Sequence, residues 1–218
     1  MQANPTRFRH GVAVATAAVL SLCASLPAMA ADFTFSGQIS FHNDVVQIDF
    51  SLAEAAANVR LWTDSWQGGL NFDPAAALWQ AAGSDFSLLA EVDDDDGIAA
   101  GQGFYDTGFL LPTLAAGSYR VTLVAAFNAA NGNLLSQGFS YGSETPILLT
   151  DWNQPSYDPN ANDQKGGFWR LNLSGVSQAS VVPEPAAWQM LLLGLLAAAP
   201  VLTRGRGPAR RKSGAQAQ

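Results

Sequence analysis

The sequence predicts an all-β fold, an antiparallel β-sandwich or barrel. Three observations predict it: short segments in which apolar and polar residues alternate, turn residues between those segments, and few helical patterns. The alternation is clearest in residues 46–52, where Val46, Ile48 and Phe50 alternate with polar residues. Because successive side chains of a strand point to opposite faces, this segment is expected to be a half-buried strand.

Further strands are expected at 33–36, 59–62, 86–92, 118–127 and 169–173. Asn131-Gly132 is a favourable turn pair. Only the alanine-rich segments 53–57 and 75–82 look helical, and both are short. An α/β sheet would need alternating helical patterns of about 10–15 residues, which the sequence lacks.

The first thirty residues have the three parts of a secretory signal peptide. A basic start at Arg7 and Arg9 precedes an almost wholly apolar or small stretch, residues 11–26. Ala28 and Ala30 then provide the small side chains required before a cleavage point at Ala31. The alternative is a retained anchor, but the apolar stretch is shorter than the ~20 residues that a spanning helix needs. We expect residues 1–30 to be removed on export.

The last forty residues combine a short motif, an apolar segment and a basic end. The motif is Val182-Pro183-Glu184-Pro185, and the apolar segment is 186–202. Arg204, Arg206, Arg210, Arg211 and Lys212 follow, which would hold that end on the cytoplasmic side. We expect a transmembrane helix over 186–202, short for a span, and a tail at 213–218. The alternative is a buried helix of the domain, but the segment is apolar on all sides.

This order of three elements, over residues 182–212, closely resembles the PEP-CTERM sorting signal of Gram-negative bacteria. The resemblance implies recognition by an exosortase, a membrane protease, and processing near Pro183–Pro185. It implies an inner-membrane intermediate, then display at the cell surface or release among extracellular polysaccharide and biofilm. One domain of about 150 residues, 31–181, remains between the two ends.

The domain is far more acidic than the whole chain. The chain has 18 acidic and 11 basic residues, but seven of the basic ones lie in the two ends. Four basic and seventeen acidic residues remain in the domain, a formal charge of −13. Such a domain repels nucleic acid and suits cations. It also has no cysteine, so packing must stabilise it, either alone or together with a bound metal.

The run Asp93-Asp94-Asp95-Asp96 is the strongest candidate for a metal site. Adjacent carboxylates repel each other unless a solvated turn or a hard cation such as calcium accommodates them. An EF-hand is excluded, because Gly97 at position six would put Val92 at position one. A less regular calcium site could draw further oxygen ligands from nearby strand ends, at Asn43, Asp44, Asp73 and Asp106. The alternative is an acidic loop that only solubilises the domain.

A second resemblance covers residues 32–142. It is carried by the Phe33–Gly37 and Asn43–Phe50 segments, the acidic run and the sequence Leu114-Ala115-Ala116-Gly117-Ser118-Tyr119-Arg120-Val121. These are similar to a family of PEP-CTERM proteins of unknown function related to bacterial pre-peptidase C-terminal domains. The resemblance implies a jelly-roll-like β-sandwich, in which some relatives bind calcium, and it does not imply an enzyme.

Aromatic residues are the other candidates for ligand binding. Trp66 and Trp152 fall in expected loops, where exposed rings could stack on sugars. Trp62 and Trp169 fall in expected strands and should fill the core, which is the commoner role of large aromatics.

Catalysis has little support in the sequence. His42 is the domain's one histidine, so a serine–histidine–acid triad would have to use it. A pair of carboxylates for glycoside hydrolysis is easily supplied by so acidic a chain. The function expected first is a non-enzymatic surface or matrix protein, structural or adhesive. A carbohydrate-binding module comes second and a glycan hydrolase third.

Overall fold

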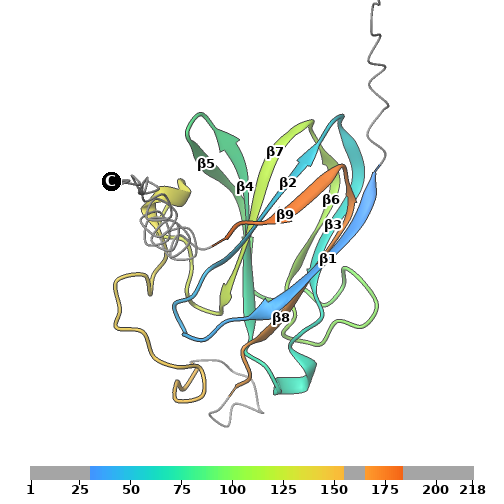
Figure 1. Ribbon diagram of the computed structural model, residues 1–218. Coiled ribbons are helices and arrows are strands. Elements are labelled where there is room, and N and C mark those ends of the chain that lie inside the picture. Colours follow the sequence, from blue (N-terminus) through green and yellow to red (C-terminus); the bar gives the residue numbers. More distant parts are fainter. Residues whose placement is uncertain (1–29, 155–164, 184–218) are drawn as a thin grey trace, which may run out of the picture.

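The computed structural model describes residues 30–154 and 165–183, which form nine strands (Figure 1). Within these residues the helical structure is limited to two short 3₁₀ turns, Gln67–Gly69 and Leu135–Gln137. The strands are β1 (Ala31–Gln38), β2 (Val46–Leu52), β3 (Ala56–Thr63), β4 (Pro74–Ala82), β5 (Asp85–Val92), β6 (Gly108–Leu114), β7 (Gly117–Ala125), β8 (Phe168–Val176) and β9 (Gln178–Val181). The all-β prediction is confirmed.

The strands form two antiparallel sheets, consistent with a β-sandwich (Figure 1). One has the order β1-β8-β3-β6 and the other β5-β4-β7-β2-β9. The first eight strands pair in a nested way: β1 with β8, β2 with β7, β3 with β6 and β4 with β5. The chain therefore folds as one long hairpin whose closed end is the β4–β5 turn and whose two arms are divided between the sheets.

The core lies between the sheets and takes one face of each strand. Ile48, Phe50 and Leu52 of β2 point into it, as the alternation in this segment predicted. Tyr119, Val121 and Leu123 of β7 meet them from the neighbouring strand. Burying these apolar side chains is the main stabilising contribution, roughly 1.5–3 kcal/mol for each large residue.

The outer face of the five-stranded sheet is only partly covered. The loop after β7 folds back over β4, and Phe139 packs there on Trp79 with ring centroids 6.2 Å apart. Ala75 and Ala77 leave room for this cover because their side chains are small. The Trp79 indole nitrogen donates a hydrogen bond of 3.0 Å to the Thr122 hydroxyl. The neighbouring part of the same face, toward β9, is hollowed into a cleft.

Three local predictions are wrong. Residues 75–82 belong to β4, a strand with neighbours on both sides, because packing on both faces outweighs the helical preference of alanine. Residues 53–57 are a turn and the start of β3. Trp62 is only partly buried, because β3 directs its neighbours Leu61 and Thr63 into the core instead. Trp169 is buried, as expected.

The expected flanking segments, the signal peptide 1–30 and the spanning helix 186–202, lie almost wholly outside the described residues. Among the residues that the structure describes, no helix has the length and apolarity to cross a membrane. Asn131-Gly132 forms a bend in the loop after β7, next to an isolated bridge between Ala130 and Phe139.

Packing between the sheets can be tested with two leucines. Leu173 of β8 is completely buried, whereas Leu110 of β6 is 48 % exposed. Leu173→Ala should cost about 2–5 kcal/mol of unfolding free energy because it leaves a cavity. The melting temperature should fall by about 5–15 °C. Leu110→Ala should change it by no more than about 2 °C. Thermal unfolding followed by circular dichroism checks both variants, and equal losses would contradict the assigned core.

Candidate functional site

Three carboxylates meet at one end of the β4–β5 hairpin. Asp73 immediately precedes β4, and Asp93 and Asp94 immediately follow β5. Pairing of Ala76 with Val92 brings the start of one strand beside the end of the other. One oxygen from each carboxylate lies within 4.8 Å of the other two. We refer to Asp73, Asp93 and Asp94 as the acidic triad.

The backbone of Asp73 is fixed by two neighbouring segments. Its N–H donates to the Gln154 side-chain oxygen at 2.9 Å, and the Gln154 amide nitrogen donates back to the Asp73 carbonyl at 2.8 Å. The Ala126 N–H donates to the same carbonyl, also at 2.8 Å. Asp73 is only 3 % exposed, whereas Asp93 and Asp94 lie at the surface. The triad thus joins one rigid, buried carboxylate to two on a surface loop.

The two loop carboxylates are held in an environment that disfavours their charge. Desolvation, followed by repulsion from Asp93 and Asp96, raises the pKa of Asp94 to about 6. Desolvation, followed by repulsion from Glu91, also raises the pKa of Asp93. A bound cation would lower the pKa values of both carboxyls again, since an opposite charge at close range favours the ionised form.

The geometry of the triad suits a hard cation. Calcium takes six to eight oxygen ligands at about 2.3–2.6 Å, so two ligands on opposite sides of the ion can be about 5 Å apart. Carboxylate oxygens within 4.8 Å of one another meet this condition. The triad would supply at least three ligands, and water and backbone carbonyls would complete the shell.

The other residues predicted as calcium ligands have different surroundings. Asp106 is 1 % exposed, and its carboxylate accepts four hydrogen bonds, from the Thr63 hydroxyl and from the N–H groups of Ser65, Trp66 and Gly103. It therefore fastens the loop after β3. Asp95 accepts a hydrogen bond from the Gly97 N–H. Asp96, next in the run, is exposed.

Asn43 and Asp44 shape a turn after β1. The Asp44 carboxylate accepts hydrogen bonds from the Ser40 and Phe41 N–H groups at 2.7 and 2.9 Å. The Asn43 amide donates to the carbonyls of Tyr141 and Glu144 at 3.4 and 3.3 Å. Of the predicted ligands, the structure brings together Asp73, Asp93 and Asp94.

A small cavity of about 270 Å³ adjoins the triad. It is lined by Ala75, Glu91, Asp93, Phe127 and Ala129. Phe127 has a positive φ of 69°, which an aromatic residue rarely adopts, and 46 % of it is exposed. The Glu91 carboxylate accepts a hydrogen bond from the Ala130 N–H, which ties the cavity wall to the loop after β7.

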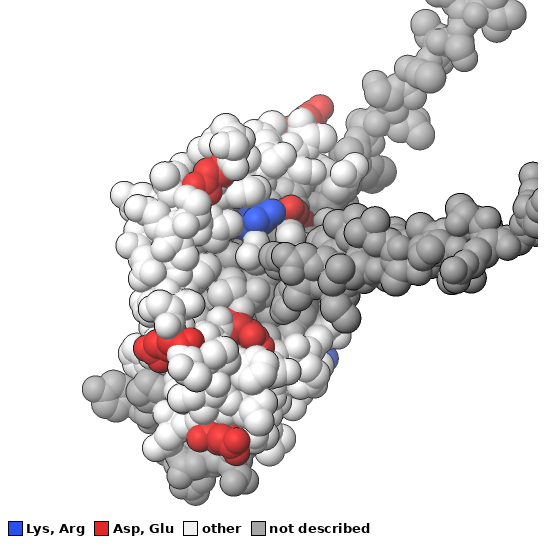
Figure 2. All heavy atoms as spheres, turned by 60° about the vertical axis from the view of Figure 1, so that its left-hand side comes forward, with Lys and Arg blue, Asp and Glu red and all other residues white. Residues whose placement is uncertain are grey.

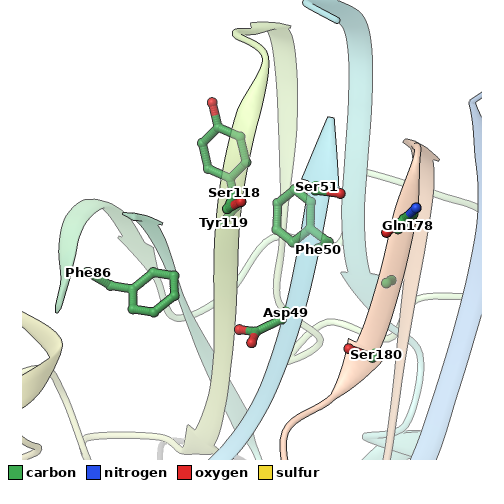
Figure 3. Close-up of a pocket in the computed structure, with 9 residues that line it drawn as sticks. Asp49, Phe50, Ser51, Phe86, Ser118, Tyr119, Gln178 and Ser180 are labelled. Atoms are coloured by element: carbon green, nitrogen blue, oxygen red, sulfur yellow. The ribbon is translucent and has the colours of Figure 1, made fainter. Parts of the chain in front are cut away.

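A second hollow, the outer-face cleft, lies on the five-stranded sheet and has a volume of about 290 Å³. Figure 3 shows its lining residues on β5, β7, β2 and β9. They are Asp49, Phe50, Ser51, Phe86, Ser118, Tyr119, Gln178, Ala179 and Ser180. The alternation in 46–52 predicts that Asp49 and Ser51 face outward, but no sequence pattern predicts a binding site at these positions.

The two tryptophans predicted as sugar platforms have unequal exposure. Trp66 is buried at 9 % exposure, against Tyr105 at a centroid distance of 5.3 Å, so the expectation of an exposed ring is wrong there. The N–H groups of Ser65 and Trp66 donate hydrogen bonds to the buried Asp106 carboxylate, which keeps this loop against the domain. Trp152 is partly buried and packs on His42 and Tyr141, with centroids 5.2 and 6.0 Å away.

His42 is enclosed in this aromatic group and is 1 % exposed. Its Nδ1 accepts a hydrogen bond from the Ile147 N–H at 3.1 Å, so in the neutral ring the proton is on Nε2. Nε2 lies 3.1 Å from a Glu144 carboxylate oxygen, to which it donates. Both ring nitrogens are thereby engaged in holding the loop around residues 141–148 against the turn after β1.

Negative charge is spread over the surface that surrounds these features. Figure 2 shows several separate groups of acidic side chains on one face and very few basic ones. Arg120 pairs with Asp49 and Arg170 with Asp64, each at 2.6 Å. The surface therefore has a surplus of acceptors and favours cations over anions.

Comparison with known proteins adds no assignment. No protein-family model matches the chain, and no curated protein matches it. The two resemblances identified in the sequence therefore stay predictions.

The raised pKa of Asp94 predicts a pH-dependent stability. Between about pH 4 and 6 the unfolded carboxyl ionises while the folded one keeps its proton, so wild-type stability falls as pH rises. In chelator, Asp94→Asn should therefore melt higher than wild type above pH 6, by about 2–4 °C after allowance for solvent screening. The difference should vanish near pH 3.5. A gain that is the same at every pH would contradict the prediction.

Proposed function

We propose that this chain is an exported, non-enzymatic β-sandwich protein of the cell surface or extracellular matrix, with a structural or adhesive role and a stabilising calcium ion. The observation that carries the calcium part is the acidic triad, which gathers oxygen ligands from two segments twenty residues apart. A cation there would join the two ends of the β4–β5 hairpin. It would also offset the repulsion that raises the pKa values of Asp93 and Asp94.

The proposal for export and sorting comes from the ends of the chain. A cleavable signal peptide over 1–30 and a PEP-CTERM signal over 182–212 would deliver residues 31–181 outside the cell, after processing by an exosortase. The position of the last strand supports this division. Strand β9 ends at Val181, and the Val182 N–H still donates to the Gln47 carbonyl at 2.9 Å. The proposed sorting motif would follow directly after this strand.

The fold supports a binding or structural role of the jelly-roll type. The nested pairing of the first eight strands fits the jelly-roll-like sandwich that the second resemblance implies. Both nitrogens of His42 serve structural hydrogen bonds, which favours a non-catalytic role for this residue. A carbohydrate-binding module is the second candidate function, and the outer-face cleft favours it. We rank a glycan hydrolase third.

The calcium proposal is tested by thermal unfolding of the purified full chain in millimolar calcium and in chelator. A specific site raises the melting temperature by mass action, by about 5–10 °C if calcium exceeds its dissociation constant about a hundredfold. Asp93→Asn should lose most of this gain because it removes a ligand. Its charge-matched control, Asp96→Asn, lies in the same acidic run but outside the triad and should keep most of it.

Asp73→Asn tests the buried ligand. It should also abolish the rise in melting temperature that calcium causes, provided that the variant still folds in chelator. Should it fail to fold, the exposed Asp93 and Asp94 variants decide the question alone. Equal wild-type melting temperatures in calcium and in chelator would overturn the calcium proposal. So would an equal loss in Asp93→Asn and Asp96→Asn, since general charge reduction would then be the cause.

A further inference from the structure

The floor of the outer-face cleft consists of two polar rows that cross three strands. Asp49 of β2 pairs in register with Arg120 of β7 on one side and Ser180 of β9 on the other. In the next outward row, Ser51 pairs with Ser118 and with Gln178. The serine side chains are short, and the larger Phe86 side chain borders them, so the sheet is hollow here (Figure 3). Arg120 lies over the Phe86 ring.

Four neutral polar side chains of the two rows are available to a ligand. The side chains of Ser51, Ser118, Gln178 and Ser180 make no hydrogen bond with any residue that the structure describes. Together they offer three hydroxyls and one amide, each able to donate and accept. All four lie on one face of the sheet within two neighbouring rows. The cleft therefore presents a concentrated set of neutral hydrogen-bonding groups.

The charged groups at the cleft are held rigidly and neutralise each other. The Arg120 guanidinium donates to both Asp49 carboxylate oxygens, at 2.6 and 3.0 Å, and to the Gln47 side-chain oxygen at 2.8 Å. Its central carbon lies 4.3 Å from the centroid of the Phe86 ring, a cation–π distance. Arg120 is only 16 % exposed, whereas Asp49 keeps 41 % of its surface and remains able to accept further hydrogen bonds.

We propose that the outer-face cleft binds an uncharged segment of an oligosaccharide. The chemistry of the lining matches such a ligand: several short neutral donors and acceptors for hydroxyl groups, one carboxylate for a pair of hydroxyls, and an aromatic ring at the border for the apolar face of a sugar. The volume, about 290 Å³, is at the lower end of small-ligand sites and suits one or two sugar rings. The proposal rests on the proposed extracellular location, where polysaccharide is the abundant polyhydroxylated ligand.

An uncharged ligand is favoured over an ion because the Asp49–Arg120 pair leaves the cleft with no net charge. A purely apolar ligand would leave the row of serine and glutamine groups without partners, which costs free energy. An extended peptide could instead pair with the edge of β9 that faces away from β2, since β9 is the outermost strand of its sheet in the described part of the chain. That mode would use backbone groups of β9 rather than the side chains on the cleft floor, so the two ligands can be distinguished by mutation.

The cleft is independent of the acidic triad. The cleft lies near Ser118 at the start of β7, and the triad lies near Ala125 at its end, where Pro74 pairs with it. Seven residues of strand separate the two positions, roughly 23 Å. Sugar binding should therefore be the same in calcium and in chelator, provided that the domain remains folded. Failure of the calcium proposal would leave this one standing, and the reverse also holds.

The test is binding of the purified full chain to neutral glucose and galactose hexasaccharides, with a uronic acid hexasaccharide as the charged comparison. The chain is kept in a detergent without a sugar headgroup, and binding is measured by calorimetry. A neutral hexasaccharide should bind. The double variant Gln178→Ala/Ser180→Ala should weaken it about tenfold or more, the effect of losing roughly two hydrogen bonds.

The matched control is Ser36→Ala/Gln38→Ala, which makes the same two changes on the exposed face of β1, the edge strand of the other sheet. It should bind like the wild type. Ser118→Tyr, which places a ring in the cleft, should abolish binding while the melting temperature stays within about 2 °C. No binding of either neutral hexasaccharide, equal weakening in the two double variants, or tighter binding of the uronic acid hexasaccharide would each overturn the proposal. Binding of an extended peptide that is insensitive to Gln178→Ala/Ser180→Ala would assign β9 to peptide pairing instead.

Discussion

Nested antiparallel pairing is the constraint on which the other features of this domain depend. Strand β8 joins β1 and β3, which lie more than a hundred residues earlier in the sequence. Each pair must keep its register, since a slip of one residue would turn the apolar side chains of a strand outward. With no cysteine to fix the arrangement, the packed faces of the two sheets hold it. Because most pairings are distant in sequence, the fold should form slowly for its size.

The sequence predicted six of the nine described strands and missed β4, β6 and β9. Of these, only β4 is covered on both faces. The alternation of residues 46–52 is visible because Asp49 and Ser51 face water. Strand β4 shows no alternation, because the loop after β7 covers its second face and alanine fills both sides. Because β4 was missed, Asp73, Asp93 and Asp94 were named among the candidate ligands but could not be separated from the others. Once β4 and β5 are recognised as a hairpin closed by Gly83 at φ +65°, their register alone brings Asp73 beside Asp93 and Asp94.

The residues of the outer-face cleft could not be predicted from the sequence, for a different reason. The cleft depends on cross-strand neighbours, and β9 follows β8 in sequence yet joins the opposite sheet beside β2. Nothing in residues 178–181 indicates that choice. The burial of Trp66 likewise depends on a residue forty positions away. The Asp106 carboxylate accepts a hydrogen bond from the Trp66 N–H and so fixes the loop that carries this ring. Both features arise from partners that only the folded topology supplies.

Strand β9 has a mechanical consequence for a protein held by its C-terminal segment. Any pull on that segment reaches the domain through Val182 and then through the four register pairs that join β9 to β2. Gln178 and Ser180 lie on β9, so the strand that carries the tension also carries part of the cleft floor. Tension sufficient to detach this short edge strand would open the cleft before it disturbed the nested strands behind it.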